Sequence, residues 1–143
     1  CDGACSGNQF SNNVGGWGVV LIYGEQIKEI FGGEKNTTNQ RMEITACIKG
    51  LEALKNNGIK INLYSDSAYV VNCMNHRWFE SWLKNGWKNA KKKPVENQDL
   101  WIRLLDLLDK YKVTFHKVKG HSGDPNNERA DKLAQKGIII TAQ

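Results

Sequence analysis

The chain has 143 residues, of which 40% are hydrophobic and 24% are charged, and its formal net charge is +5. This size and composition are typical of one soluble globular domain, and the longest apolar runs are too short to cross a bilayer, which excludes a membrane-spanning protein. The four cysteines lack zinc-finger spacing, and the first residues do not read as a secretion signal. We therefore expect reduced thiols in a cytoplasmic protein rather than a disulfide framework.

The first residues, CDGACSGN, place Asp2 ahead of small residues and a Gly-Asn turn. This pattern is typical of the exposed end of a strand, although nothing before it can form that strand. We expect the first strand to be truncated at the amino terminus. The apolar tail at 138–141 is an alternative occupant of its place.

A hairpin and a helix are predicted next. Residues 15–23 and 25–33 are β-rich runs separated by Gly24, as in a hairpin. Thr38 or Asn39 is a suitable N-cap for a helix that continues through residue 57 and stops at Gly58.

The second half of the chain alternates between strands and helices. The expected elements are a buried strand at 59–66, a short helix at 67–74, helix then loop at 76–95, a periodic helix at 97–111, a strand at 112–120 and a last helix at 125–136. Two consecutive strands followed by this alternation predict an α/β fold with a mixed sheet flanked by helices.

The basic charge is concentrated in one stretch. Residues 76–93, HRWFESWLKNGWKNAKKK, hold six cations against one acid, a net charge of +5 that equals the charge of the whole chain, together with three of the five tryptophans. Cations and flat rings suit a sugar-phosphate backbone, because they release counterions and stack on bases. A solvated basic loop over a tryptophan-filled satellite core is an equally good interpretation of this stretch alone.

Four acids occupy unusual positions. With Met42 at 0° on a helical wheel, Glu43 falls at about 100°, in the middle of the apolar face, where an uncompensated carboxylate is unfavourable. Asp2 and Asp66 are expected at the carboxyl ends of strands, where α/β sheets bind ligands, and Asp131 flanks the apolar stripe of the last helix. The alternatives are a buried ion pair or a helix-dipole contact for Glu43, an N-cap for Asp66 and a surface acid for Asp131.

Together, these acids suggest a single site. Two aspartates at strand ends and two acids on inward helix faces would form a cluster that needs cations, and oxygen ligands select Mg²⁺ or Mn²⁺ over zinc. With a basic aromatic groove beside it, the cluster favours paired metals that cleave phosphodiesters.

The chain resembles type 1 ribonuclease H. The matching motifs are DGACSGN with the following GGWG, TTNQRMEITA, YSDSAYV, WLKNGWKNAKKKPVENQDLW and VKGHSGDPNNERADKLA, in the family's order and over most of positions 2–137. The resemblance implies one ribonuclease H domain over residues 1–143, with a central five-stranded mixed sheet. It also implies hydrolysis of the RNA strand of RNA–DNA hybrids, which leaves 5′-phosphate and 3′-hydroxyl ends.

The resemblance assigns roles to the acids and to one histidine. Asp2, Glu43, Asp66 and Asp131 correspond to the family's catalytic metal ligands, which hold two Mg²⁺ ions when substrate is bound, with Mn²⁺ as a substitute. His121 corresponds to a loop histidine that assists proton transfer or product release.

The resemblance also implies a nucleic-acid surface. The basic stretch at about 76–95 corresponds to a protruding handle that holds the DNA strand, and Trp78 and Thr38 to its phosphate site. The hybrid-groove contacts correspond to Asn8, Asn39, Gln40 and Asn97. The other expected contacts are Lys84, Trp87, Lys88, Lys91, Lys92 and Lys93.

Three features depart from the family pattern: a longer turn after Asn8, Ala68 in place of a common glutamine, and the missing first strand. A non-catalytic binder of hybrid or double-stranded RNA and the nuclease domain of a reverse transcriptase remain alternative functions. The leading expectation is a monomeric enzyme that binds an RNA–DNA hybrid and needs no membrane and no obligate protein partner.

Overall fold

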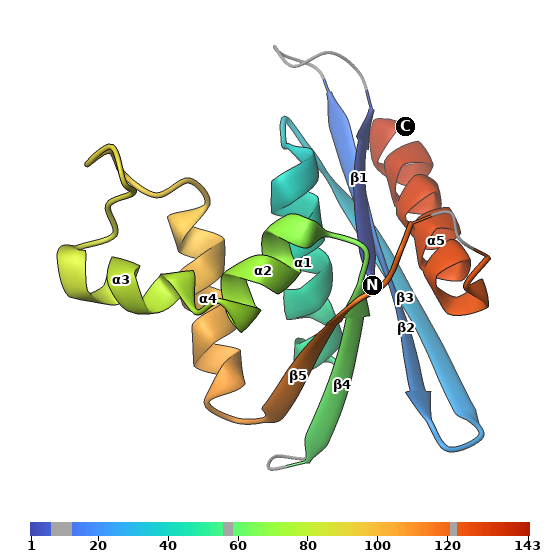
Figure 1. The fold of residues 1–143 in the computed structure, drawn as a ribbon. Coiled ribbons are helices and arrows are strands. Elements are labelled where there is room, and N and C mark those ends of the chain that lie inside the picture. The colour runs from blue at the N-terminus through green and yellow to red at the C-terminus, as the bar shows by residue number, and fades with distance from the viewer. Residues whose placement is uncertain (7–12, 56–58, 121–122) are drawn as a thin grey trace.

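The structure is a computed structural model, and it describes residues 1–6, 13–55, 59–120 and 123–143. Its strands and helices confirm the predicted α/β class (Figure 1). The strands are β1 (Asp2–Ser6), β2 (Val14–Tyr23), β3 (Gln26–Lys35), β4 (Lys60–Ser65) and β5 (Lys112–Lys117). The helices are α1 (Asn39–Glu52), α2 (Ala68–Asn75), α3 (Trp78–Asn85), α4 (Gln98–Leu108) and α5 (Pro125–Ala142). Within the described ranges, every helix is too short or too polar to cross a membrane.

The strands pair in both directions, as predicted, but they form two sheets where one was expected. β1, β2 and β3 are antiparallel neighbours in that order, and β4 pairs with β5 in parallel. The two sheets come together where the amino group of Cys1 donates to the carbonyl oxygen of Tyr64 at 3.0 Å. β1 pairs with β2 only as far as Gly18, so it leaves the rest of that strand without a neighbour on this side. A groove of about 1140 Å³ lies there, lined by residues of β2, α1 and β4.

One expectation about the first strand fits the structure, and its alternative is wrong. Residues 2–6 form β1, a short strand that pairs only with residues 14–18 of β2 and leaves the groove beside residues 19–23, as expected for a truncated first strand. Small side chains along both strands allow this pairing to lie beneath the helices. The tail at 138–141 does not fill a strand position, because it continues α5, which packs along β2 and β3 (Figure 1).

Helices α1 and α5 pack against opposite faces of the three-stranded sheet, and two glycines allow their close approach. A Cβ atom on Gly3 would lie 2.3 Å from the carbonyl carbon of Met42 in α1, and one on Gly18 would lie 2.4 Å from the carbonyl oxygen of Ala130 in α5. Gly18 is also the partner of Asp2 in the β1–β2 register. The backbones of both helices are therefore held close to the start of β1.

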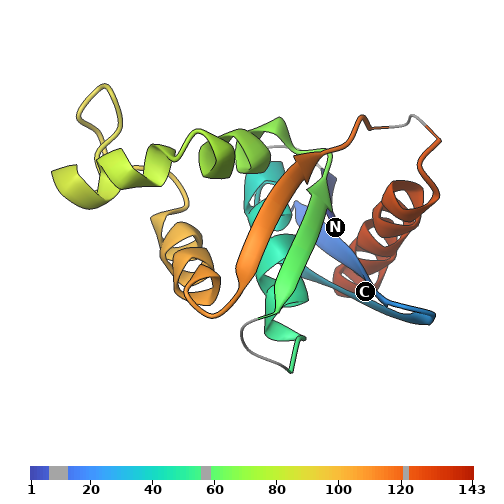
Figure 2. The same ribbon diagram turned by 60° about the horizontal axis from the view of Figure 1, so that its bottom comes forward.

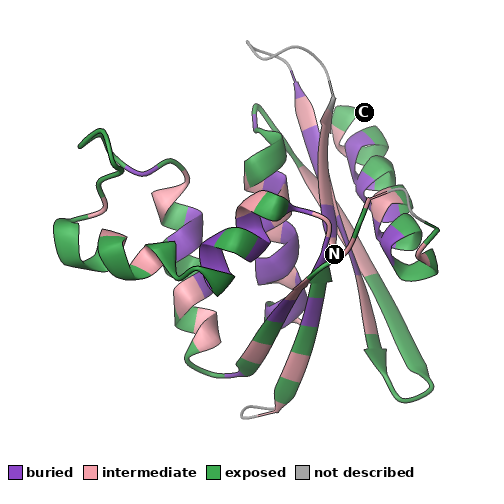
Figure 3. Cartoon of the chain, viewed as in Figure 1, coloured by how far each residue is buried: buried purple, intermediate pink, exposed green. Residues whose placement is uncertain are grey.

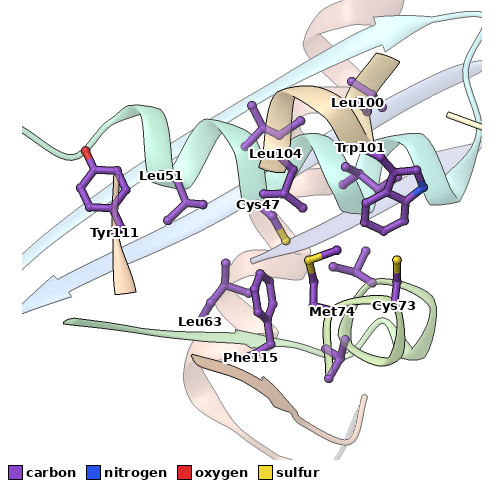
Figure 4. Packing of buried hydrophobic residues seen from close by; sticks show 14 of the residues in the cluster. Cys47, Leu51, Leu63, Cys73, Met74, Leu100, Trp101, Leu104, Tyr111 and Phe115 are labelled. Atoms are coloured by element: carbon purple, nitrogen blue, oxygen red, sulfur yellow. The ribbon is translucent and has the colours of Figure 1, made fainter. Parts of the chain in front are cut away.

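The hydrophobic core lies between α1, the helices α2 and α4, and the parallel pair β4–β5. Buried surfaces of these elements face one another in Figure 3, and Figure 4 shows Cys47 and Leu51 of α1 opposite Met74 and Phe115. Trp101 of α4 is fully buried. Figure 2 shows β4 and β5 side by side in front of α1.

Helix α1 begins where predicted and ends earlier. The hydroxyl of Thr38 accepts from the backbone N–H of Arg41, which confirms the predicted cap. The helix ends at Glu52 rather than at residue 57: the N–H of Leu54 donates to the carbonyl oxygen of Leu51 in a tighter turn, and the carbonyl oxygen of Leu54 accepts a hydrogen bond from the Tyr111 hydroxyl at 3.2 Å. The predicted stop at Gly58 lies outside the described residues.

The substitution Gly3→Ala tests the close approach of β1 to α1. The added methyl group would overlap backbone atoms that cannot move alone, so we expect a loss of about 1–3 kcal/mol in the free energy of unfolding. Gly50→Ala is the matched control, because its Cβ would meet only the Val19 side chain, at 3.1 Å, and alanine favours a helix. Equal urea-unfolding midpoints for the two variants would contradict this packing.

Candidate active site

Three carboxylates from separate elements meet at one place. Asp2, Glu43 and Asp66 each offer an oxygen atom, and these atoms lie within 4.8 Å of one another. Asp2 opens β1, Glu43 lies in the second turn of α1, and Asp66 follows the last residue of β4. We call these three residues the carboxylate cluster.

Asp2 reaches this place by a route that the sequence did not predict. It is the first residue of its strand and not the last, so the rule about carboxyl ends of strands applies to Asp66 but not to Asp2. The contact of the Cys1 amino group with Tyr64 brings Asp2 beside the end of β4. The N–H of Gly3 donates to Asp2 Oδ1 at 2.9 Å, which fixes the carboxylate further.

Glu43 is held by a neutral donor. The hydroxyl of Ser67 donates to Glu43 Oε2 at 2.6 Å. The same hydroxyl accepts from the N–H of Val70 at 3.1 Å and so caps α2. The carboxylate that sequence periodicity placed on the apolar face of α1 is thus fixed by the residue that follows Asp66.

The cluster is an unfavourable place for negative charge. Burial, followed by the charge of Asp66 and a hydrogen bond with Asp131, raises the pKa of Asp2 from 3.8 to about 8. Burial also raises the pKa of Glu43, with a further contribution from Asp66 that the Ser67 hydrogen bond opposes. A bound divalent cation would offset this repulsion, and carboxylate oxygens are the ligands that Mg²⁺ and Mn²⁺ prefer. The donor set therefore fits such an ion.

The fourth predicted acid lies beside the cluster. Asp131 is on α5, next to Ala130, whose carbonyl oxygen packs against Gly18. Its carboxyl group interacts with Asp2, but it is not among the three that are mutually within 4.8 Å. The sequence prediction of four converging acids is thus met by three at close range and one at the side of Asp2.

The loop after β5 borders the cluster. A Cβ atom on Gly120 would lie 3.1 Å from Asp66 Oδ2, so the chain passes close to this carboxylate. His121, which the sequence analysis placed in the site, lies outside the described residues, as does Asn8.

The remaining amide candidates lie near the amino-terminal ends of α1 and α4. Asn39 and Gln40 are exposed at the start of α1, and Asn97 caps α4 in a left-handed conformation. Arg41 connects the two helices: its Nη1 donates to Asn97 Oδ1 at 3.4 Å, and it forms two hydrogen bonds of 3.1 Å with Asp99. The sequence analysis assigned no role to Arg41 or Ser67, although each lies within a quoted motif.

The handle, residues 76–95, separates its lysines from most of its aromatic surface. Lys84, Lys88, Lys91, Lys92 and Lys93 are exposed. The one acid of the stretch, Glu80, pairs with Arg77 at 2.5 Å, and Asn89 Oδ1 accepts from the N–H groups of Lys91 and Lys93. The lysine turn is therefore built by local hydrogen bonds and faces solvent.

The tryptophans of the handle differ in exposure. Trp78 is 43% exposed, while Trp82 and Trp87 are half-buried. The ring centroid of Trp82 lies 5.9 Å from that of Trp87 and 5.8 Å from that of Trp101. Both interpretations of this stretch thus apply in part: these two rings join the core, and the lysines and Trp78 remain exposed.

The substitution Asp2→Asn tests the electrostatic cost of the cluster. Because the pKa of Asp2 is raised on folding, the metal-free folded protein holds a proton that the unfolded chain releases, and its stability falls as pH rises from about 4 to about 8. The variant removes this dependence, so in EDTA at pH 8 we expect it to be more stable by about 0.5–2 kcal/mol. Thermal unfolding at pH 5 and pH 8 measures the effect.

Asp106→Asn, an exposed acid on α4, is the control for loss of one negative charge. If Asp2→Asn and Asp106→Asn showed the same change in stability between the two pH values, the carboxylate cluster would not be the cause of the loss of stability at high pH.

Comparisons with known proteins agree with this geometry. The sequence model of the RNase H family matches residues 1–139. Curated relatives named ribonuclease H are 57% identical in Syntrophomonas wolfei and 56% identical in Chlorobaculum parvum, each over 96% of this chain and over 92% and 91% of the relative. Among solved structures, LC9-RNase H1, a type 1 RNase H with the type 2 active-site motif, has a TM-score of 0.83 at 30% identity and covers 97% of this chain and 70% of its own.

A foamy viral protease-reverse transcriptase, solved with an RNA/DNA hybrid, shares the fold with a TM-score of 0.76, at 24% identity over 97% of this chain and 19% of its own. The family model matches nearly the whole length of the chain, and the relatives are more than 50% identical to it. This chain therefore belongs to the ribonuclease H family and is an endoribonuclease that acts on RNA–DNA hybrids.

Proposed function

We propose that this chain hydrolyses the RNA strand of RNA–DNA hybrids with two Mg²⁺ ions and leaves 5′-phosphate and 3′-hydroxyl ends. The observation that carries the proposal is the mutual approach within 4.8 Å of three buried or half-buried carboxylates. Such a cluster is unfavourable without cations, and the same chain carries an exposed basic surface in its handle.

The proposed metal ligands are Asp2, Glu43 and Asp66, with Asp131 as a fourth from the side of α5. When bound, Mg²⁺ would supply an activated water and stabilise the leaving 3′-oxygen. The protein fixes its ligands in advance: Gly3 and Ser67 hold one oxygen each of Asp2 and Glu43. His121 is proposed to move a proton during the reaction or to assist release of the product.

The proposed substrate surface combines amides and cations. Asn39, Gln40 and Asn97 lie at the starts of α1 and α4, where they suit the shape and 2′-hydroxyl groups of a hybrid, and Asn8 is proposed to join them. The handle lysines, Trp78 and Thr38 would contact DNA phosphates. Half-buried Trp87 supports this surface from the core side. Such contacts carry no sequence preference, so we expect cleavage of hybrids of many sequences.

The wider assignment is also part of the proposal. We infer one domain over residues 1–143, a monomer without an obligate protein partner, and a cytoplasmic location, which fits four cysteines that form no disulfide with one another. The carboxylate cluster distinguishes the enzyme from a non-catalytic binder, because binding alone gives no reason to keep acids that destabilise the fold. The handle favours a separate enzyme over the nuclease domain of a reverse transcriptase.

Cleavage of a labelled hybrid tests the reaction. With Mg²⁺ we expect the RNA strand to be cut and the DNA strand to stay intact, and we expect EDTA to stop the reaction. Asp66→Asn should lower kcat/KM about 100-fold or more, since a ligand of the reacting site is lost. Asp106→Asn serves as the control. An intact hybrid in Mg²⁺, or full activity of Asp66→Asn, would overturn the proposal.

The salt dependence of binding tests the handle. Neutralising Lys91, Lys92 and Lys93 to glutamine should weaken hybrid binding and lower the slope of log K against log salt by up to about 3, because up to three phosphate contacts are lost. Single-turnover cleavage at saturating enzyme should change little. The control variant neutralises exposed Lys28, Lys60 and Lys112, which gives the same change in net charge. Equal slopes for the two triple variants would mean that the handle makes no phosphate contacts.

A further inference from the structure

The hydroxyl of Ser67 connects a helix cap to the carboxylate cluster. Its oxygen lies 2.6 Å from Glu43 Oε2 and 3.1 Å from the backbone nitrogen of Val70. We propose that Ser67 is a positioning residue that fixes the Glu43 carboxylate for binding of the divalent cation. This inference rests on the proposed function of the cluster.

The direction of both hydrogen bonds follows from the donors available. A serine hydroxyl has one hydrogen atom and two lone pairs. The N–H of Val70 can only donate, so it occupies a lone pair of the hydroxyl and leaves the hydrogen for Glu43. Glu43 Oε2 is therefore an acceptor in this arrangement, and the carboxylate is held at one oxygen while its second oxygen stays available to a cation.

Ser67 itself has little freedom to move. It is 4% exposed, and its backbone N–H donates to the hydroxyl of Ser65, which is 1% exposed, at 3.1 Å. It also follows Asp66 directly in the chain. The residue that orients Glu43 is thus tied to the end of β4, to the start of α2 and to a neighbouring ligand.

The hydrogen bond acts against the repulsion within the cluster. The negative charge of Asp66 disfavours an ionised carboxylate at Glu43, and a side chain free to rotate about its χ angles would turn away from it. The Ser67 hydroxyl holds Glu43 beside Asp66 before any ion arrives. Pre-orientation of this kind lowers the free energy that metal binding must supply, and loss of such an outer partner commonly weakens metal affinity about 10- to 100-fold.

Ser67→Gly and Ser67→Thr separate positioning from capping. Glycine is tolerated at an N-cap within a few tenths of a kcal/mol but has no hydroxyl, whereas threonine keeps both functions. We expect Ser67→Gly to need about 10- to 100-fold more Mg²⁺ than the wild type, and Ser67→Thr to stay close to the wild type. The direct measurement is the Mg²⁺ concentration that gives half of the metal-induced rise in Tm, and the Mg²⁺ dependence of cleavage is the second.

A double-mutant cycle with Glu43→Gln identifies the route of the effect. If Ser67 acts through Glu43, then Ser67→Gly should change Mg²⁺ affinity in the wild-type background and have little further effect in the Glu43→Gln background. A purely structural role would lower the Tm in EDTA by the same amount in both backgrounds and leave the Mg²⁺ response unchanged, which would overturn the inference. A wild type with no Mg²⁺ response would instead overturn the proposed function.

Discussion

The close approach of two helix backbones to the start of β1 is the constraint on which the site depends. Gly3 lets α1 lie against one face of the strand, and Gly18 lets α5 lie against the other. Because Asp2 precedes Gly3 and pairs with Gly18, it lies where both helices come nearest to the sheet. Glu43 and Asp131 follow from the same two contacts, one on each helix. A larger residue at either glycine would separate the acids as well as the elements.

This packing brings like charges together at an energetic cost. The raised pKa of Asp2 reports that the folded chain resists full ionisation of the cluster. The rest of the fold tolerates this cost, because the core on the other side is apolar: Ile48 of α1 and Trp101 of α4 are fully buried in it. The site is thus unfavourable by itself and favourable with a cation, which is the behaviour expected of a metal centre.

The handle joins the same core by a different contact. Trp82 and Trp87 pack toward Trp101, so α3 and the lysine turn are anchored through aromatic rings rather than through the sheet. This arrangement lets a strongly basic segment stand outside the core without disturbing it. It also explains why three tryptophans and five lysines are interleaved in one stretch: the burial of two rings positions the exposed charges.

Hydrophobic periodicity predicted most of the helices and strands. The features that it missed depend on strand pairing and on helix caps. Glu43 was recognised from its angle on the apolar face, and Asp66 from the end of a buried strand. The place of Asp2 within its strand was predicted incorrectly: the small residues that follow it were interpreted as a turn after a strand, whereas residues 2–6 form the strand by pairing with β2. The division into two sheets was not predictable either, because it follows from the lack of a ladder between β1 and β4, which meet at the hydrogen bond from Cys1 to Tyr64. Ser67 was not predicted to have a role, and the sequence offered Asp66 as the cap of α2, because sequence does not show that the Ser67 hydroxyl faces an acid from another element.

The central claim is that the carboxylate cluster is a divalent-metal site. A crystal structure of the protein soaked in Mn²⁺, with anomalous diffraction to locate the ions, tests it most directly. The account predicts an anomalous peak at coordination distance from oxygen atoms of Asp2, Glu43 and Asp66, and its loss in crystals of Asp66→Asn. A map of the wild-type protein at saturating Mn²⁺ with no peak between these three residues would contradict it.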